Sequence, residues 1–285
     1  MRFSTQQASR RSGVLIASAL VTMLVVPAVA RAQYSAPGLS TSAVGEKYHI
    51  EVSGTLWNPD LFGMISSEQF GQVGTTIDFL DDLGYAKTRF KDLRIVLRPS
   101  RKAKLRVQYT PIEYEAETRF TRNIVFNGIN FPVAVPVESS FAWKVWRLGY
   151  QYDFVSRSRG SVGMLLEVRQ TQADARLKTN SPLFSPAIDE FSMVRAPLPA
   201  FGVVGRAYPV QALALNFEVS GFRLPDVDPK YQAKYFDWDI NGTYNFTNNF
   251  GVQLGWRKMT TFLLVERDLG DVKFQGTWFG GVVRY

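Results

Sequence analysis

The side chains best suited to catalysis in this sequence are its single histidine, His49, and two polar pairs, Ser139–Ser140 and Asp81–Asp82. A serine becomes a nucleophile only when a base lies within hydrogen-bonding distance. His49 lies at the start of the first predicted strand, whereas both polar pairs lie in stretches on the long-loop side, about a membrane thickness away. We therefore predict that the chain is not an enzyme and that His49 is a polar residue facing the interior.

No metal or cofactor site is predicted either. The sequence contains no cysteine, and one histidine cannot form a zinc site without several convergent carboxylates. No glycine-rich segment has the strand–turn–helix layout of a phosphate-binding loop. The chemistry of the chain must therefore come from how its elements place charged and apolar side chains.

Residues 1–32 have the layout of a secretory signal peptide, with a basic start, an apolar run over 13–30 and small residues around Arg31. We expect cleavage after Ala32, and an uncleaved N-terminal membrane anchor is the alternative. Cleavage removes four arginines and no acid, so the net charge falls from +8 to +4. Nucleic-acid binding then loses most of its support. Residues 33–285 are predicted to form a single exported domain.

Apolar residues in the mature chain recur with a period of two. In "ALALNFEVSGF", Leu213, Leu215 and Phe217 share one face, and Asn216 and Glu218 share the other. The stretches 93–98, 146–154 and 235–246 alternate in the same way. This period is typical of strands with one apolar and one polar face, so the chain is predicted to be all-β.

Short and long connections alternate along the chain, which is the layout of a transmembrane barrel with tight turns at one end. The short connections are 99–104, 156–160, 207–211 and 247–249, and the long ones are 58–87, 118–135, 177–195, 223–233 and 263–270. We predict a closed antiparallel barrel of about ten strands, with eight or twelve as alternatives. Twelve would require 74–80 to pair with part of 118–131. The predicted strands are 47–57, 88–98, 103–116, 136–154, 161–176, 196–206, 211–222, 234–246, 250–262 and 272–285.

Three prolines fall in or beside these strands. Pro111 predicts a bulge or the point at which the third strand leaves the membrane, because proline removes a hydrogen-bond donor from the ladder. Pro197 and Pro199 suggest that the ordered part of the sixth strand starts near Ala200.

Charged residues populate the polar face of these strands, and aromatic residues gather beside the short turns. Rings at strand ends suit a bilayer interface, which favours an outward apolar face and an inward charged face. The predicted lumen charges are Glu51, Arg94, Arg98, Arg106, Arg147, Asp153, Glu167, Arg169, Glu218, Asp237, Asp239 and Arg257.

The last predicted strand, "VKFQGTWFGGVVRY", ends with Gly280, Val283 and Tyr285. This ending resembles the C-terminal assembly signal of Gram-negative outer-membrane β-barrel proteins, although Trp278 stands where that signal usually has a polar residue. The resemblance implies a location in the outer membrane, closure of the last strand against the first and recognition by the barrel-assembly machinery. It also implies lipid and lipopolysaccharide as surroundings. A monomer is expected.

Two functions remain open, with an outer-membrane hydrolase as a third. The first is a structural or surface-interaction barrel whose lumen is filled by paired charges. The second is a narrow porin-like channel, in which Arg94, Arg98 and Arg106 could form a positive strip. The first long loop contains Leu61, Phe62, Met64 and Ile65, which could pack over the barrel mouth or contact lipopolysaccharide or a partner.

Overall fold

The computed structural model describes residues 43–67, 74–179, 188–225, 230–265 and 268–285. The side chains of residues 188–194 and 196 are not described. The predicted signal peptide and its cleavage site lie outside the described residues.

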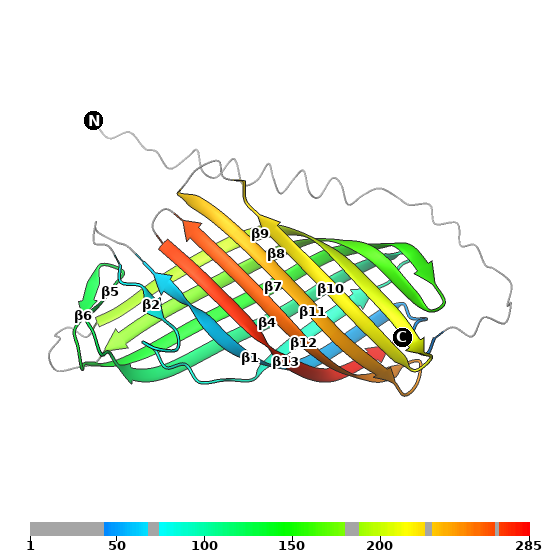
Figure 1. The fold of residues 1–285 in the computed structure, drawn as a ribbon, viewed down its shortest axis with the longest axis horizontal. Helices are drawn as coiled ribbons and strands as arrows, with labels where there is room; N and C mark the ends of the chain where they lie inside the picture. Colours follow the sequence, from blue (N-terminus) through cyan, green and yellow to red (C-terminus); the bar gives the residue numbers. More distant parts are fainter. Residues whose placement is uncertain (1–42, 68–73, 180–187, 226–229, 266–267) are drawn as a thin grey trace. The chain divides into compact units, whose positions relative to one another are not determined.

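Ten long antiparallel strands in the described part of the chain form a closed barrel (Figure 1). β1 pairs with β13 from Glu51–Arg284 to Ser66–Leu269, which closes the sheet on itself. The predicted all-β fold and ten-strand barrel are thereby confirmed. The barrel strands are β1 (Ile50–Ser66), β3 (Phe90–Leu97), β4 (Ala103–Arg119), β7 (Pro136–Arg157), β8 (Gly160–Thr179), β9 (Ile188–Val210), β10 (Leu213–Arg223), β11 (Tyr231–Asn245), β12 (Phe250–Val265) and β13 (Asp268–Arg284).

Three short strands are not part of the barrel wall, and this excludes the twelve-strand alternative. β2 (Ile77–Asp78) pairs with only two residues of β1, Met64 and Ile65. β5 (Ile124–Phe126) and β6 (Ile129–Phe131) pair only with each other, as a hairpin within the connection from β4 to β7. The eight-strand alternative is likewise wrong.

The period of two places apolar side chains outside and polar side chains inside. On β7, Trp146 and Leu148 are more than half exposed, whereas Arg147 and Asp153 are buried. The same holds on β12, where Leu254 is 65% exposed and Arg257 is buried. An outer wall of exposed apolar residues is suited to lipid rather than water, and closure of the barrel removes the open sheet edge that a bilayer does not tolerate.

Aromatic side chains mark the two edges of this apolar wall. Phe246 stacks on Phe250 and meets Tyr244 edge-to-face beside the short β11–β12 turn, and Trp238 and Trp256 contact each other farther along the same strands. On β7, the nine residues from Trp146 to Phe154 span about 27 Å along the strand, on the order of the apolar band of such barrels. No helix in the described ranges is long and apolar enough to cross a membrane.

The strands continue well past this band at the end with the long connections. β7, β8 and β9 have 22, 20 and 23 residues, whereas about 9–11 residues suffice to cross a bilayer. The predicted boundaries were wrong at this end. β1 runs to Ser66, so Leu61, Phe62, Met64 and Ile65 belong to a strand rather than to a loop.

Proline residues explain why these boundaries were misjudged. Pro59 and Pro111 lie beyond the last ladder pairs with β3, Trp57–Phe90 and Tyr109–Leu93, and Pro197 and Pro199 lie beyond the last ladder pair of β9 with β10, Phe201–Gly221. Each proline is therefore paired on one side only, and its missing N–H can face the unpaired side without the loss of a ladder hydrogen bond. The pairing of β4 with β7 continues through Pro111 without a bulge, and β9 begins at Ile188 rather than near Ala200.

Candidate functional site: the barrel interior

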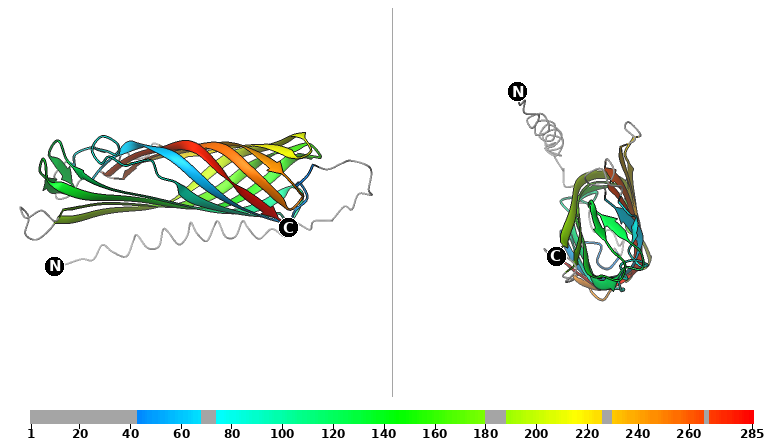
Figure 2. Two further views of the ribbon diagram at one scale, coloured as in Figure 1. Left: turned by 90° about the horizontal axis from the view of Figure 1, so that it is seen from below. Right: turned by 90° about the vertical axis from the view of Figure 1, so that its left-hand side faces the viewer.

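The interior contains three successive layers along the barrel. We call residues 43–49 the short-turn plug, the buried charged side chains of the strands the charge network, and residues 74–85 with 120–135 the long-loop plug. The end-on view in Figure 2 shows the β5–β6 hairpin within the outline of the barrel. Each layer is built by a different part of the sequence.

Arg147 of β7 is the centre of the charge network. Its guanidinium group contacts three carboxylates from three other strands: Glu167 at 3.0 Å, Glu218 at 2.7 Å and Asp237 at 3.2 Å. All four side chains are at most 12% exposed. The alternation of β7 directs Arg147 inward, and its length lets it reach across the lumen.

Further arginines complete the charges around these carboxylates. Asp237 also binds Arg257 at 2.9 Å and Arg169 at 3.2 Å. Arg169 lies 3.8 Å above the ring of Tyr235 and forms an ion pair with Glu167. Because each buried carboxylate meets more than one guanidinium group, its desolvation is offset by several charge-assisted hydrogen bonds.

A second group of ion pairs lies toward the short-turn end. Arg284 Nε lies 2.5 Å from Glu51 Oε2, which links the last strand to the first inside the closure of the barrel. Arg206 lies 3.9 Å from the same carboxylate, and Lys104 Nζ lies 2.8 Å from Asp153. These contacts tie together strands that are far apart in the sequence.

The structure places all twelve predicted lumen charges on the inner face, and eleven of them take part in ion pairs within the described part of the chain. Asp239 instead accepts hydrogen bonds from Trp278 Nε1 at 2.8 Å and Asn241 Nδ2 at 2.7 Å. The predicted positive strip does not form, because Arg94 and Arg106 both contact Glu218 whereas Arg98 turns to Glu46.

Five charged residues of the interior were missed by the sequence reading: Glu46, Asp92, Lys104, Arg206 and Arg284. Extending the alternation to the strand ends identifies four of them, since Asp92 shares the face of Arg94 and Lys104 that of Arg106. Glu46 precedes the first strand, so periodicity gives no signal for it.

The short-turn plug folds back into the barrel end. Asn245 Nδ2 donates to the carbonyl of Val44 at 3.0 Å, and the Tyr208 hydroxyl donates to Glu46 at 2.6 Å. Tyr48 lies under the guanidinium groups of Arg98 and Arg284 at 5.1 and 5.7 Å. Burial, together with the charge of Glu51, raises the pKa of Tyr48 to about 12.

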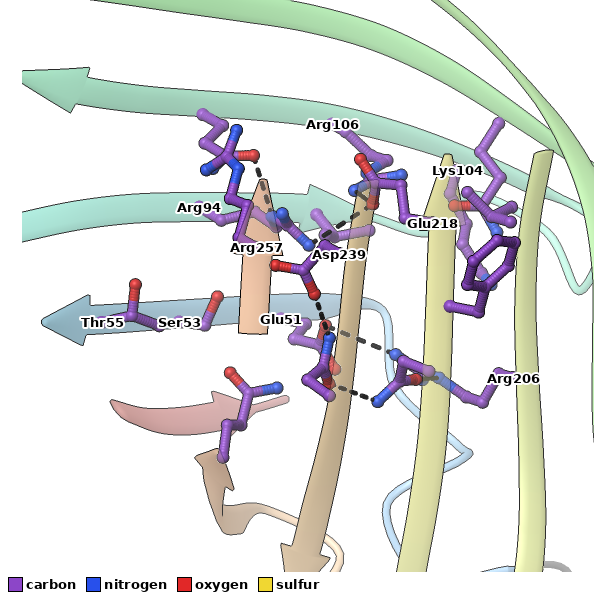
Figure 3. Close-up of a pocket in the computed structure, with 18 of the residues that line it drawn as sticks. Glu51, Ser53, Thr55, Arg94, Lys104, Arg106, Arg206, Glu218, Asp239 and Arg257 are labelled. Carbon is purple, nitrogen blue, oxygen red and sulfur yellow. Dashed lines mark hydrogen bonds and ion pairs between the residues drawn. The ribbon is translucent and has the colours of Figure 1, made fainter. Parts of the chain in front are cut away.

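A polar cavity remains between the short-turn plug and the rings of Trp57 and Trp278 (Figure 3). The space open to water-sized molecules is about 80 Å³, which holds only a few waters. Its charged lining is mixed and consists of Glu51, Asp92, Glu218 and Asp239 with Arg94, Lys104, Arg106, Arg206 and Arg257.

The long-loop plug fills the other end with apolar side chains. Ile77, Phe79, Ile124 and Phe131 are fully buried and belong to one hydrophobic cluster with Trp57. Phe79 contacts Phe141 of the wall at 4.7 Å between ring centroids. Sequence reading treated these residues as loop because apolar residues without a regular period give no secondary-structure signal.

One charged pair fastens the two parts of the long-loop plug to each other. Arg122 Nη2 lies 2.6 Å from Asp82 and 2.7 Å from the carbonyl of Thr76. Burial alone would raise the pKa of Asp82, but hydrogen bonds from Arg122 and from the backbone N–H of Asp78 outweigh it and hold this pKa below its usual value. The pair thus remains charged at neutral pH.

The predicted catalytic candidates do not come together. His49 is exposed at the short-turn end, where its backbone N–H donates to Tyr285, so the expectation that its side chain faces the interior was wrong. Ser139 lies at the opposite end, where its hydroxyl donates to the carbonyl of Ala116 at 3.2 Å. No cluster of three potential metal ligands occurs among the residues that the structure describes.

The residues of the predicted assembly signal lie on both faces of β13. Val283 and Tyr285 face outward with exposures of 57% and 83%, whereas Gly280 shares the inward parity of Trp278 and lies opposite Thr55 of β1. Their role in assembly stays a prediction of the resemblance. Arg284, between them, is buried through its contact with Glu51.

Comparison with known proteins identifies similar barrels but assigns no activity. No protein-family model matches the sequence, and a search of curated protein sequences finds no significant match. The outer-membrane protease OmpT of Escherichia coli matches with a TM-score of 0.49 at 11% identity, over 83% of this chain and 96% of that one. Neisserial surface protein A matches with a TM-score of 0.35 at 14% identity, over 83% and 97% of the two chains.

The outer-membrane protein AlkL matches with a TM-score of 0.38 at 14% identity, over 88% of this chain and 96% of that one. At these identities the likeness concerns the fold alone. The closed barrel and its exposed apolar wall indicate a membrane-spanning β-barrel without reference to these similar structures. The predicted class and location are thus confirmed: the chain is an outer-membrane β-barrel protein.

Proposed function

We propose that this barrel is non-conducting and non-catalytic, and that it serves a structural or surface-interaction role. The observation that carries the proposal is closure of the lumen at three levels. A solute entering from the short-turn end would meet residues 43–49, then the ion pairs of Arg147, and then the fully buried side chains around Phe79.

Each closure is costly to open. Separating Arg147 from its carboxylates leaves buried charges without partners, and breaking a buried pair in this way costs about 3–5 kcal/mol. Displacing the long-loop plug would expose the Ile77, Phe79 and Phe131 side chains to water, at about 1.5–3 kcal/mol for each. The part of the protein left for interaction is the outward extension of β7, β8 and β9.

Conductance of the purified full chain in planar lipid bilayers tests the proposal. We expect no channel steps and no salt-dependent current. Stepwise conductance from the unmodified chain would contradict it and would favour the narrow porin-like channel. In that case, the triple replacement Arg94→Gln, Arg98→Gln and Arg106→Gln should alter ion selectivity, because these side chains lie along the lumen.

The hydrolase alternative has no geometric support in the described residues, since His49 and Ser139 lie at opposite ends of the barrel. Hydrolysis of phospholipid or lipid A by the purified protein, abolished by His49→Ala, would revive it. We expect no such activity in either protein.

A further inference from the structure

Three lysines lie on the outward face of neighbouring strands β11, β12 and β13: Lys234, Lys258 and Lys273. In the β12–β13 register, Lys258 is opposite Gln275 and Thr260 is opposite Lys273. Lys258 and Lys273 are therefore diagonal neighbours on one face, a relation that places side chains about 7–8 Å apart. Two cations at this spacing repel each other unless an anion lies between them.

These lysines differ from those on the opposite part of the wall. Lys144 and Lys178 have acidic partners, Glu113 at 2.8 Å and Glu138 at 3.6 Å. Within the described ranges, Lys234, Lys258 and Lys273 form no ion pair with any carboxylate. Asp271 lies on the same outward face two residues from Lys273, but it does not pair with it. Among the described residues, these three lysines, which we call the lysine patch, thus have Asp271 and Asp60 on the same outward face but no carboxylate within ion-pair distance, and Asp60 is already paired with Lys87.

Aromatic rings surround the lysine patch. Lys234 lies 5.5 Å above the ring of Phe262, and Lys273 lies 5.2 Å above that of Phe62. Lys258 is opposite Trp238, which contacts Trp256 at 4.6 Å. Lysine ammonium groups that lie over aromatic rings, with their apolar stems along the wall, suit the boundary between lipid tails and head groups.

We propose that the lysine patch binds the phosphate group of a lipid in the outer leaflet. The phosphate neutralises Lys258 and Lys273 together, while the acyl chains lie along the apolar wall below them, near Trp256 and Leu254. Leu254, at 65% exposed, supplies the apolar surface that a lipid tail covers and that a soluble phosphate would leave in water. This inference concerns the outer wall, so it stands whether or not the lumen conducts.

Native mass spectrometry of the full-length barrel released from phosphatidylcholine bilayers that contain phosphatidic acid tests this site. Each basic residue near a membrane surface strengthens binding of an anionic lipid about fivefold. The double variant K258Q/K273Q should therefore hold phosphatidic acid about twenty-five-fold more weakly. The matched control K144Q/K178Q removes two lysines whose charges are already paired, and it should retain the lipid as the unmodified chain does.

Folding of each variant is checked first by heat-modifiable migration on a gel, which should be unchanged because all four lysines lie on the outer surface. Equal loss of phosphatidic acid in both double variants, or no loss in K258Q/K273Q, would overturn the proposal. Inorganic phosphate forms the third arm of the experiment. If it displaces phosphatidic acid at equal concentration, the ligand is a free phosphate and the lipid site is wrong.

Discussion

Arg147 is the residue on which the interior depends most, because three carboxylates from three strands converge on it. Alternation along β7 was enough to predict that Arg147 faces inward. Its partners could not be predicted, since Glu218 lies 71 residues away and the contact exists only once the barrel has closed. The same holds for Arg284 and Glu51, separated by 233 positions.

Replacing Arg147 by alanine should leave Glu167, Glu218 and Asp237 with fewer counter-charges. We expect the free energy of unfolding to fall by about 3–5 kcal/mol, as for other buried ion pairs that lose one partner. Lys144→Ala on the same strand breaks only the surface pair with Glu113 and should change stability by less than about 1 kcal/mol. Urea unfolding of both variants in lipid vesicles measures the two changes. Similar losses of unfolding free energy would mean that the buried ion pairs of Arg147 contribute no more than the surface pair of Lys144.

At the scale of elements, the long-loop plug depends on the pair between Asp82 and Arg122. The pKa of Asp82 in the folded chain lies below its unfolded value of about 3.9. The stabilisation is therefore present in full above pH 4 and is lost as the pH falls through the lowered pKa. We expect pepsin to cleave next to the exposed Leu80 only as the pH falls through this range.

Asp82→Asn should make the same bond susceptible to pepsin already at the upper end of the range, because Arg122 then has no carboxylate to pair with at any pH. Asp81→Asn is the matched control, since Asp81 is exposed and the neighbouring carboxylate is left intact. Cleavage of the unmodified chain that does not depend on pH would show that the pair does not fasten the plug.

The sequence predicted these elements unevenly for a physical reason. In the membrane band, one face meets lipid and the other meets polar groups, so alternation is strict and the strands were placed correctly. Beyond the band, both faces of β1 carry apolar residues, with Leu61 buried and Phe62 exposed, and the period disappears. Strand ends and plug there depend on packing between distant segments, which a local pattern does not encode.

For the whole molecule, the defining property is an apolar exterior. Leu254→Arg places a charge on the lipid-facing surface and should destabilise the barrel in vesicles by up to about 2–4 kcal/mol. Leu80→Arg, in an exposed turn, should change stability by less than about 0.5 kcal/mol. Urea titration in vesicles, with the folded fraction read from heat-modifiable migration on a gel, gives both values. Equal tolerance of the two changes would be inconsistent with lipid around β12.

The staggered strand ends have a consequence for copies of this protein crowded side by side. Where β9 outruns β10 and β4 outruns β3, unpaired backbone would otherwise offer a template on which a neighbouring chain could add its own strand. Pro111, Pro197 and Pro199 interrupt the donors along those stretches. We therefore expect crowded copies of this barrel to remain separate molecules rather than to pair through their exposed strand edges.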